Sequence, residues 1–279
     1  MSNEPIIRTM RREDVDFAIR LAAKEGWNPG LSDAESFHAA DPEGFFVSEL
    51  NGQPVGTISA VRYGDGFGFV GLYIMIPEAR GRGWGLRLWN HAMARLDGCN
   101  VGLDAVTAQE ATYARAGFAT HYRSARYEGE GGGARPEGVL RLDENNFEAV
   151  AAYDLRCFPE PREPFLRAWL DAPGVRAFGV AGSGGLAGYG VIRPCARGYK
   201  IGPLFADDGA VADVLYRALA ASVPGEKVYL DVIEPNAAAV DLARGHGLSE
   251  VFTTVRMYTG GEPAVDRDRV FGVTSFELG

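Results

Sequence analysis

Residues 71–96 constrain the fold most, because they join a strand, a glycine-rich turn and an amphipathic helix with no spare residues between them. Residues 72–76 are apolar and β-branched enough for a buried strand, and Pro77 ends it because proline has no backbone N–H to donate. From Gly85 to Leu96 apolar residues recur at helical spacing, and Gly98 then provides a stop. The segment therefore predicts a strand, a short loop and a helix of about three turns.

The loop of this segment, residues 80–85, reads RGRGWG, so every second residue from 81 to 85 lacks a Cβ. Such a backbone can approach a ligand closely, and the free amides at a helix start favour an anion. Arg80 and Arg82 add charge suited to phosphate. A P-loop would need Lys-Ser/Thr where Leu86-Arg87 stand, and the third glycine of a dinucleotide-binding fingerprint is missing. We expect a phosphate-binding loop outside those two folds.

In this order of elements the chain resembles the GCN5-related N-acetyltransferase (GNAT) superfamily, whose signature is Arg/Gln-x-x-Gly-x-Gly/Ala after a strand with a proline-containing end. Arg80, Gly83 and Gly85 match it in register. The resemblance implies that the loop holds the pyrophosphate of acetyl-coenzyme A (acetyl-CoA) and that the strand pairs with its pantetheine arm. The expected coenzyme contacts are Tyr73, Ile74, Met75, Ile76, Arg80, Gly81, Arg82, Gly83, Trp84, Gly85 and Leu86.

Composition limits the other classes of function. The 279 residues, 46% hydrophobic and 23% charged, suffice for one large or two ordinary globular domains. No apolar run reaches the length of a membrane span, and the first residues lack the basic and apolar regions of a signal peptide, so we expect a cytoplasmic protein without a membrane partner. A net charge of −9 argues against nucleic acid and suits an amine substrate.

Cysteine and histidine give no sign of a metal site. The three cysteines, Cys99, Cys157 and Cys195, are far apart and odd in number, which argues against a disulfide framework. The four histidines show no ligand spacing. We therefore predict no metal cofactor.

The element order repeats after a glycine-rich stretch. Residues 128–138 contain no periodicity, and we place a linker at residues 129–138 between an N-terminal domain, 1–128, and a C-terminal domain, 139–279. A hairpin at residues 177–193 and strands at 200–205 and 228–232 then repeat the first half. The repeat indicates two tandem folds. The resemblance implies that each is of the α/β (α+β) class, with a mixed, mostly antiparallel sheet flanked by helices.

The second half lacks the phosphate loop. Its strand leads into Ala206-Asp207-Asp208-Gly209, where an aspartate can satisfy the free helix amides and repel a pyrophosphate. We expect one coenzyme site per chain and a degenerate C-terminal domain that is either structural or part of the acceptor pocket, as in a tandem bacterial subgroup of the superfamily that this chain resembles. The tail, residues 269–278, alternates apolar and polar residues, which is typical of an extra strand.

Tyr113 stands four residues before the pair Gly117-Phe118, where many members of the superfamily place a tyrosine. The resemblance implies a general acid for the departing coenzyme A thiolate. A phenol with a pKa near 10 can fill that role while protonated at neutral pH. The alternative is a tyrosine that only packs at the edge of the sheet.

The acceptor pocket is expected from the segment between the first two helices, which the superfamily uses for this purpose. Trp27 either packs on the core at a helix end or forms a wall of that pocket. Asn28 and Asp33 are the other expected substrate contacts.

Direct acetyl transfer to a primary amine of a small molecule requires a proton acceptor, because an alkylamine is mostly charged at pH 7. Asp104 is the first candidate and Glu35 the second. Asp231 occupies the equivalent place in the second half, which favours a structural role for Asp104 instead. Backbone amides at residues 74–76 are the expected oxyanion donors.

Two other functions remain open at this stage. A non-catalytic acyl-CoA binding or sensing module would need only the phosphate loop, and a protein interaction scaffold would need no coenzyme at all. The sequence is compatible with a monomer or a homodimer and does not identify the acceptor.

Overall fold

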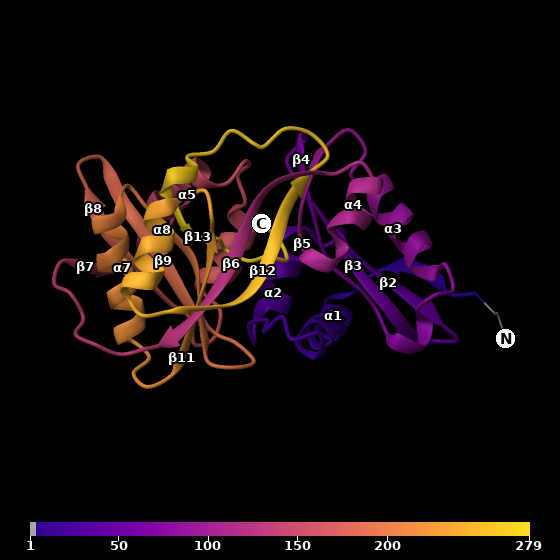
Figure 1. Cartoon of the computed structure of the whole chain (residues 1–279), viewed down its shortest axis with the longest axis horizontal. Coiled ribbons are helices and arrows are strands. Elements are labelled where there is room, and N and C mark those ends of the chain that lie inside the picture. The colour runs from indigo at the N-terminus through magenta and orange to yellow at the C-terminus, as the bar shows by residue number, and fades with distance from the viewer. Residues whose placement is uncertain (1–3) are drawn as a thin grey trace.

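The computed structural model describes residues 4–279, in which the expected element order appears twice (Figure 1). The first half contains β1 (Ile6–Thr9), α1 (Arg12–Lys24), α2 (Asp33–Ala40), β2 (Phe45–Leu50), β3 (Gln53–Tyr63), β4 (Phe67–Met75), α3 (Trp84–Arg95), β5 (Asn100–Val106), α4 (Glu110–Arg115) and β6 (Ala119–Glu130). The second half contains β7 (Val139–Arg141), α5 (Phe147–Cys157), α6 (Glu163–Leu170), β8 (Arg176–Gly182), β9 (Gly185–Pro194), β10 (Tyr199–Ala206), α7 (Gly209–Ala221), β11 (Lys227–Ile233), α8 (Ala237–Gly245), β12 (Ser249–Tyr258) and β13 (Val270–Gly272).

The two halves share one mixed sheet and exchange their last long strands. The strand order is β1-β2-β3-β4-β5-β12-β6-β11-β10-β9-β8-β7, with β13 paired to β10 outside this path. β12 of the second half therefore lies between β5 and β6, while β6 pairs with β11 of the second half. In Figure 1, β6 and β12 run side by side through the middle of the molecule. Gly129 and Glu130, at the start of the expected linker, are the last residues of β6.

Two buried ion pairs join the exchanged strands to their new neighbours. Asp104 of β5 accepts two hydrogen bonds from Arg256 of β12, at 2.8 and 2.7 Å. Asp231 of β11 accepts two from Arg126 of β6, at 2.6 and 2.7 Å. Each pair stands opposite in strand register, so the aspartate of one half binds the last long strand of the other half in both places.

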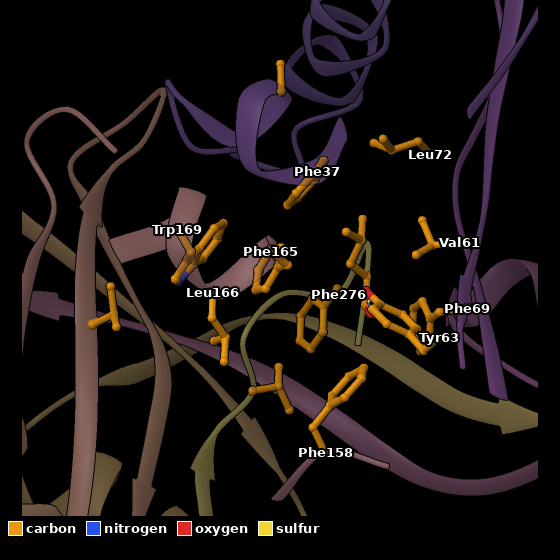
Figure 2. Close-up of a cluster of buried hydrophobic side chains, with 14 of the residues drawn as sticks. Phe37, Val61, Tyr63, Phe69, Leu72, Phe158, Phe165, Leu166, Trp169 and Phe276 are labelled. Carbon is orange, nitrogen blue, oxygen red and sulfur yellow. Dashed lines mark hydrogen bonds between the residues drawn. The ribbon is translucent and has the colours of Figure 1, made fainter. Parts of the chain in front are cut away.

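The helices cover both faces of the sheet, and one apolar cluster crosses the boundary between the halves. α2 packs against α6, where Phe37 stacks on Trp169 with ring centroids 6.2 Å apart. Figure 2 shows these side chains facing Tyr63 and Phe69 of the first half, with Phe276 of the tail among them. None of the helices described between residues 4 and 279 is both long and apolar enough to cross a membrane.

The tail forms a shorter strand than its alternation predicts. Only Val270–Gly272 pairs, as β13 against β10. Residues 273–279 then leave the second half and reach the first, where the Tyr63 hydroxyl donates to the Leu278 carbonyl oxygen at 3.1 Å. Within this last stretch the Leu278 N–H donates to the Ser275 hydroxyl at 3.1 Å, so the chain turns locally there.

Candidate active site

A cavity opens where β4 and β5 separate. These strands pair in parallel only from Phe67 to Val70, opposite residues 100–103. Beyond that point β4 is distorted, because Leu72 has a φ of 49° and its carbonyl oxygen accepts from the Thr57 hydroxyl at 2.8 Å. The resulting cavity has an empty volume of about 660 Å³, its mouth included, and is lined by residues of both halves.

The strand residues expected to contact the coenzyme have different surroundings. Tyr73 lines the cavity, whereas the Ile74 side chain is buried in the core. Met75 packs on Gly56, with its carbonyl oxygen accepting from Arg80 Nε at 2.8 Å. The Ile76 N–H donates to the Val55 carbonyl oxygen at 3.0 Å. The expected oxyanion donors at residues 74–76 therefore cannot include the Ile76 amide.

The loop after β4 leaves room for a ligand close to its backbone. Gly81 and Gly83 have φ values of 74° and 78°, and a Cβ built at either would meet no atom within 4 Å. The α3 helix starts at Trp84, and no side chain caps its first backbone amides. These features fit a pyrophosphate, for which free amides and nearby positive charge are the requirement.

The side chains around this loop connect it to the cavity. Arg80 lies at the surface and pairs with Glu25 at 2.7 Å. Arg82 stacks on the Trp84 ring, and Trp84 itself is buried, while Leu86 is exposed. At Gly85, a Cβ would stand 2.9 Å from the Tyr73 hydroxyl. Because Tyr73 also lines the cavity, the loop and the cavity adjoin.

Tyr113 lies in the cavity wall, as its expected role requires. It reaches the cavity from α4, packs against Trp89 with ring centroids 5.4 Å apart, and lies near Tyr73. Burial raises the pKa of Tyr113 to about 12. The hydroxyl therefore stays protonated at neutral pH and can donate a proton into the cavity.

The expected substrate contacts separate into two groups. Trp27 lines the cavity, packs on the core, and accepts a 2.6 Å hydrogen bond from Arg126 through its carbonyl oxygen. Asn28 is buried away from the cavity, where its side chain bonds Cys195 and the backbone of Arg197. Asp33 is buried in an ion pair with Arg193 at 2.8 Å. Asn28 and Asp33 therefore attach the α1–α2 loop to the second half.

The two carboxylates expected to accept a proton differ in position. Asp104 lines the cavity, but its fully buried side chain uses both oxygens on Arg256. Burial raises the pKa of Asp104, and the Arg256 guanidinium opposes that rise. Glu35 lies on the exposed side of α2, paired with Arg12 at 2.6 Å, and is not among the residues that line this cavity.

Glu277 is one of the cavity residues that the sequence analysis missed. Glu277, from the tail of the second half, lines the cavity and is 3% exposed. No spacing rule connects residue 277 with residues 71–113. The available signal was a single charge in the otherwise uncharged stretch of residues 270–278.

The second half has filled the matching positions with its own chain. β10 and β11 pair in parallel only from Tyr199 to Ile201, and β13 then pairs with β10 beyond that point. The Val273 N–H donates to the Asp231 carbonyl oxygen at 2.9 Å. At the start of α7 the Asp208 carboxylate accepts from two backbone amides, both at 2.9 Å.

Comparison with known proteins agrees with this geometry. Residues 10–118 match the Acetyltransferase (GNAT) family, and residues 150–272 match an Acetyltransferase (GNAT) domain. The chain is 35% identical over 261 residues to holothin acyltransferase from Pseudoalteromonas sp. (strain SANK 73390), covering 92% of this chain and 89% of that one.

Solved structures show the same fold at lower identity. A putative acetyltransferase from Pyrococcus horikoshii superposes with a TM-score of 0.84 at 24% identity, covering 100% of this chain and 97% of that one. A tandem GNAT protein from the clavulanic acid biosynthesis pathway gives 0.64 at 18% identity, covering 93% and 100%.

The fold and the relatives together define an acyltransferase that uses an acyl-CoA donor. The chain belongs to the GNAT family and carries two GNAT domains in tandem. The expected fold class, a tandem α+β arrangement with mostly antiparallel strands, is confirmed.

Proposed function

We propose that this protein transfers an acetyl group from acetyl-CoA to a primary amine of a small molecule, at one site per chain. The observation that carries the proposal is the cavity between β4 and β5, which adjoins the glycine-rich loop through Tyr73 and contains Tyr113 in its wall. A loop suited to pyrophosphate and an enclosed site for the acyl group thus follow each other along one strand.

The chemistry asks little of the protein beyond alignment and proton transfer. The donor supplies a thioester, which is already activated toward an amine. The loop at residues 80–85 holds the phosphates with backbone amides and with the Arg80 charge. The Tyr113 hydroxyl gives its proton to the sulfur that leaves, and the mainly apolar walls of the cavity exclude water.

A small-molecule acceptor is supported by the relative named holothin acyltransferase, because the similarity extends over nearly the whole of both chains. The cavity also favours a small acceptor, because residues of both halves, including the tail, enclose a space of about 660 Å³.

A single coenzyme site is supported by the contrast between the halves. In the second half, the Asp208 carboxylate takes the amides that a pyrophosphate would need, and β13 occupies the place where the strands separate. We infer that the C-terminal domain, residues 139–279, does not bind acetyl-CoA.

Calorimetric titration of acetyl-CoA tests the coenzyme site. We expect one molecule bound per chain in the wild type and an affinity lowered by about 100-fold in Arg80→Glu, since the change removes a charged phosphate contact and adds a repulsive carboxylate. Arg244→Glu, at an exposed position of α8, changes the net charge equally and should bind normally. No binding to the wild type would contradict the proposal and favour a scaffold, and two bound molecules would contradict the single site.

Turnover tests the role of Tyr113. With a panel of primary amines, Tyr113→Phe should slow coenzyme A release by about 100-fold or more while leaving acetyl-CoA affinity unchanged. Equal rates in variant and wild type would show that Tyr113 only packs. Absence of release with any amine, together with tight acetyl-CoA binding, would favour the sensing module.

A further inference from the structure

Glu277 is a buried carboxylate whose charge no ion pair neutralises directly. Its residue is 3% exposed, and within the described part of the chain Oε2 receives no hydrogen bond. The other buried carboxylates nearby are engaged: Asp33 with Arg193, Asp231 with Arg126. A buried ionised group without a partner is costly, so its retention calls for a function.

The tail holds Glu277 tightly at the point where β4 is distorted. A Cβ at Gly71 would come within 2.1 Å of the Glu277 carbonyl oxygen, so only glycine permits this approach. Phe276, the preceding residue, has the Arg126 guanidinium 5.2 Å from its ring centroid. The segment that carries Glu277, a residue of the cavity lining, is therefore packed closely against β4.

Three positively charged side chains lie near Glu277. Arg126 lines the same cavity, and the charge of Glu277 contributes to raising the pKa values of Arg126 and Arg193. Lys200 is also close enough for Glu277 to oppose the lowering of its pKa. None of the three lies within ion-pair distance of Glu277 in the described residues, because Arg126 and Arg193 pair with Asp231 and Asp33.

Five of the other residues that line the cavity are aromatic. Trp27, Tyr73, Tyr113, Phe252 and Phe276 surround the space in front of Glu277. Flat apolar walls suit a ring system.

Building on the proposed function, we propose that the acceptor is an amine carried on a flat aromatic body, and that Glu277 binds its amino group and takes its proton. The ammonium ion gives one proton to the Glu277 carboxylate, which passes it to solvent. The nitrogen lone pair then forms the C–N bond as the C–S bond breaks. Sulfur leaves with the bonding electrons and takes the proton of Tyr113, and the second proton of the nitrogen then restores the Tyr113 hydroxyl. The products are an amide, a free thiol and one released proton.

Tryptamine and its uncharged analogue 3-ethylindole are suitable probes, titrated into the protein with and without saturating coenzyme A. Glu277→Gln should weaken tryptamine binding by about tenfold or more and leave 3-ethylindole binding unchanged. Glu277→Asp keeps the charge and should retain tryptamine binding within a few fold. Glu250→Gln, at an exposed position of β12, is the matched control and should behave as wild type.

Equal tryptamine affinity in Glu277→Gln and wild type would overturn the proposal, as would failure of the wild type to bind either probe. Loss of both probes together would indicate a merely structural residue and would also overturn it. Acetyl-CoA titration keeps the two proposals apart. Normal acetyl-CoA binding with no effect of Glu277→Gln removes only the role of Glu277, whereas absent acetyl-CoA binding removes the proposed function itself.

Discussion

The two halves have the same order of elements. They differ in whether backbone polar groups stay unpaired, so that a ligand could bind them. Gly71 of β4 and Gly202 of β10 each stand one residue beyond the last parallel pair of their strand, so the two glycines occupy equivalent positions. Both glycines are approached by the tail: a Cβ would lie 2.1 Å from the Glu277 carbonyl oxygen at Gly71, and 2.5 Å from that of Thr274 at Gly202. In the first half a cavity remains beside this contact, while in the second β13 fills the corresponding place.

The helix starts differ in the same sense. α3 begins after Gly83 without a side-chain cap, whereas α7 begins after Asp208, which accepts from two amides. An anion site at a helix start requires donors that the chain leaves unsatisfied, and this contrast supports the proposal that only the first half binds acetyl-CoA.

We expect the largest effect on stability at the two buried ion pairs, which occupy equivalent positions in the two halves. Asp104→Asn and Asp231→Asn should each lower the free energy of unfolding by about 3–5 kcal/mol, because each leaves a buried arginine uncompensated. Urea denaturation measures both. If Asp104→Asn instead unfolds like the wild type and loses turnover, the equivalence is broken and Asp104 acts in catalysis.

We expect the next largest effect on stability at Lys200 of β10. The equivalent position of β4 is occupied by Phe69, which carries no charge. Burial and the nearby Arg126 charge lower the pKa of Lys200 from 10.5 to about 8. Below pH 8 the lysine is protonated in both the folded and unfolded states, and the folded state bears the full cost. Lys200→Met should therefore stabilise the protein at pH 7 by up to about 3 kcal/mol.

That gain should shrink as pH rises from 8, where folded Lys200 loses its proton, and vanish above about 10.5. Thermal unfolding of variant and wild type across this range provides the measurement. If the stability difference between variant and wild type did not change with pH, Lys200 would be neutralised by a partner. Its charge would then not be what distinguishes this position from Phe69.

The smallest effect concerns the helix start. Asp208→Ala removes the cap of α7 and should cost about 1 kcal/mol of unfolding free energy. Since β13 still fills the second half, acetyl-CoA should still bind at one site per chain. Calorimetry that found a second molecule would show that the carboxylate alone closes that site.

Local signals in the sequence predicted the parts that depend on neighbouring residues. The strand, the loop at residues 80–85 and α3 lie within one continuous segment, and the structure contains them as expected. The repeat of elements in the second half also follows from local patterns. Tyr113 reaches the cavity because its short helix follows directly from β5.

Features that depend on contacts between the halves escaped prediction. Nothing in the alternation of β6 or β12 states which strand each will pair with, so the exchange is invisible in the sequence. Asn28 and Asp33 look like pocket residues, but Asn28 bonds to Arg197 in the β9–β10 turn and Asp33 to Arg193 of β9. Glu277 enters the site only because the tail returns across the boundary.

The exchange of β6 and β12 also determines the order in which the protein can be made. β5 has no permanent neighbour on its open side until residues 249–258 arrive, and the tail that seats Glu277 comes later still. We therefore expect that the nascent first domain cannot complete its pocket on the ribosome, and that a gene truncated at residues 129–138 yields an unfinished sheet. Synthesis must reach the last residues before either half is whole.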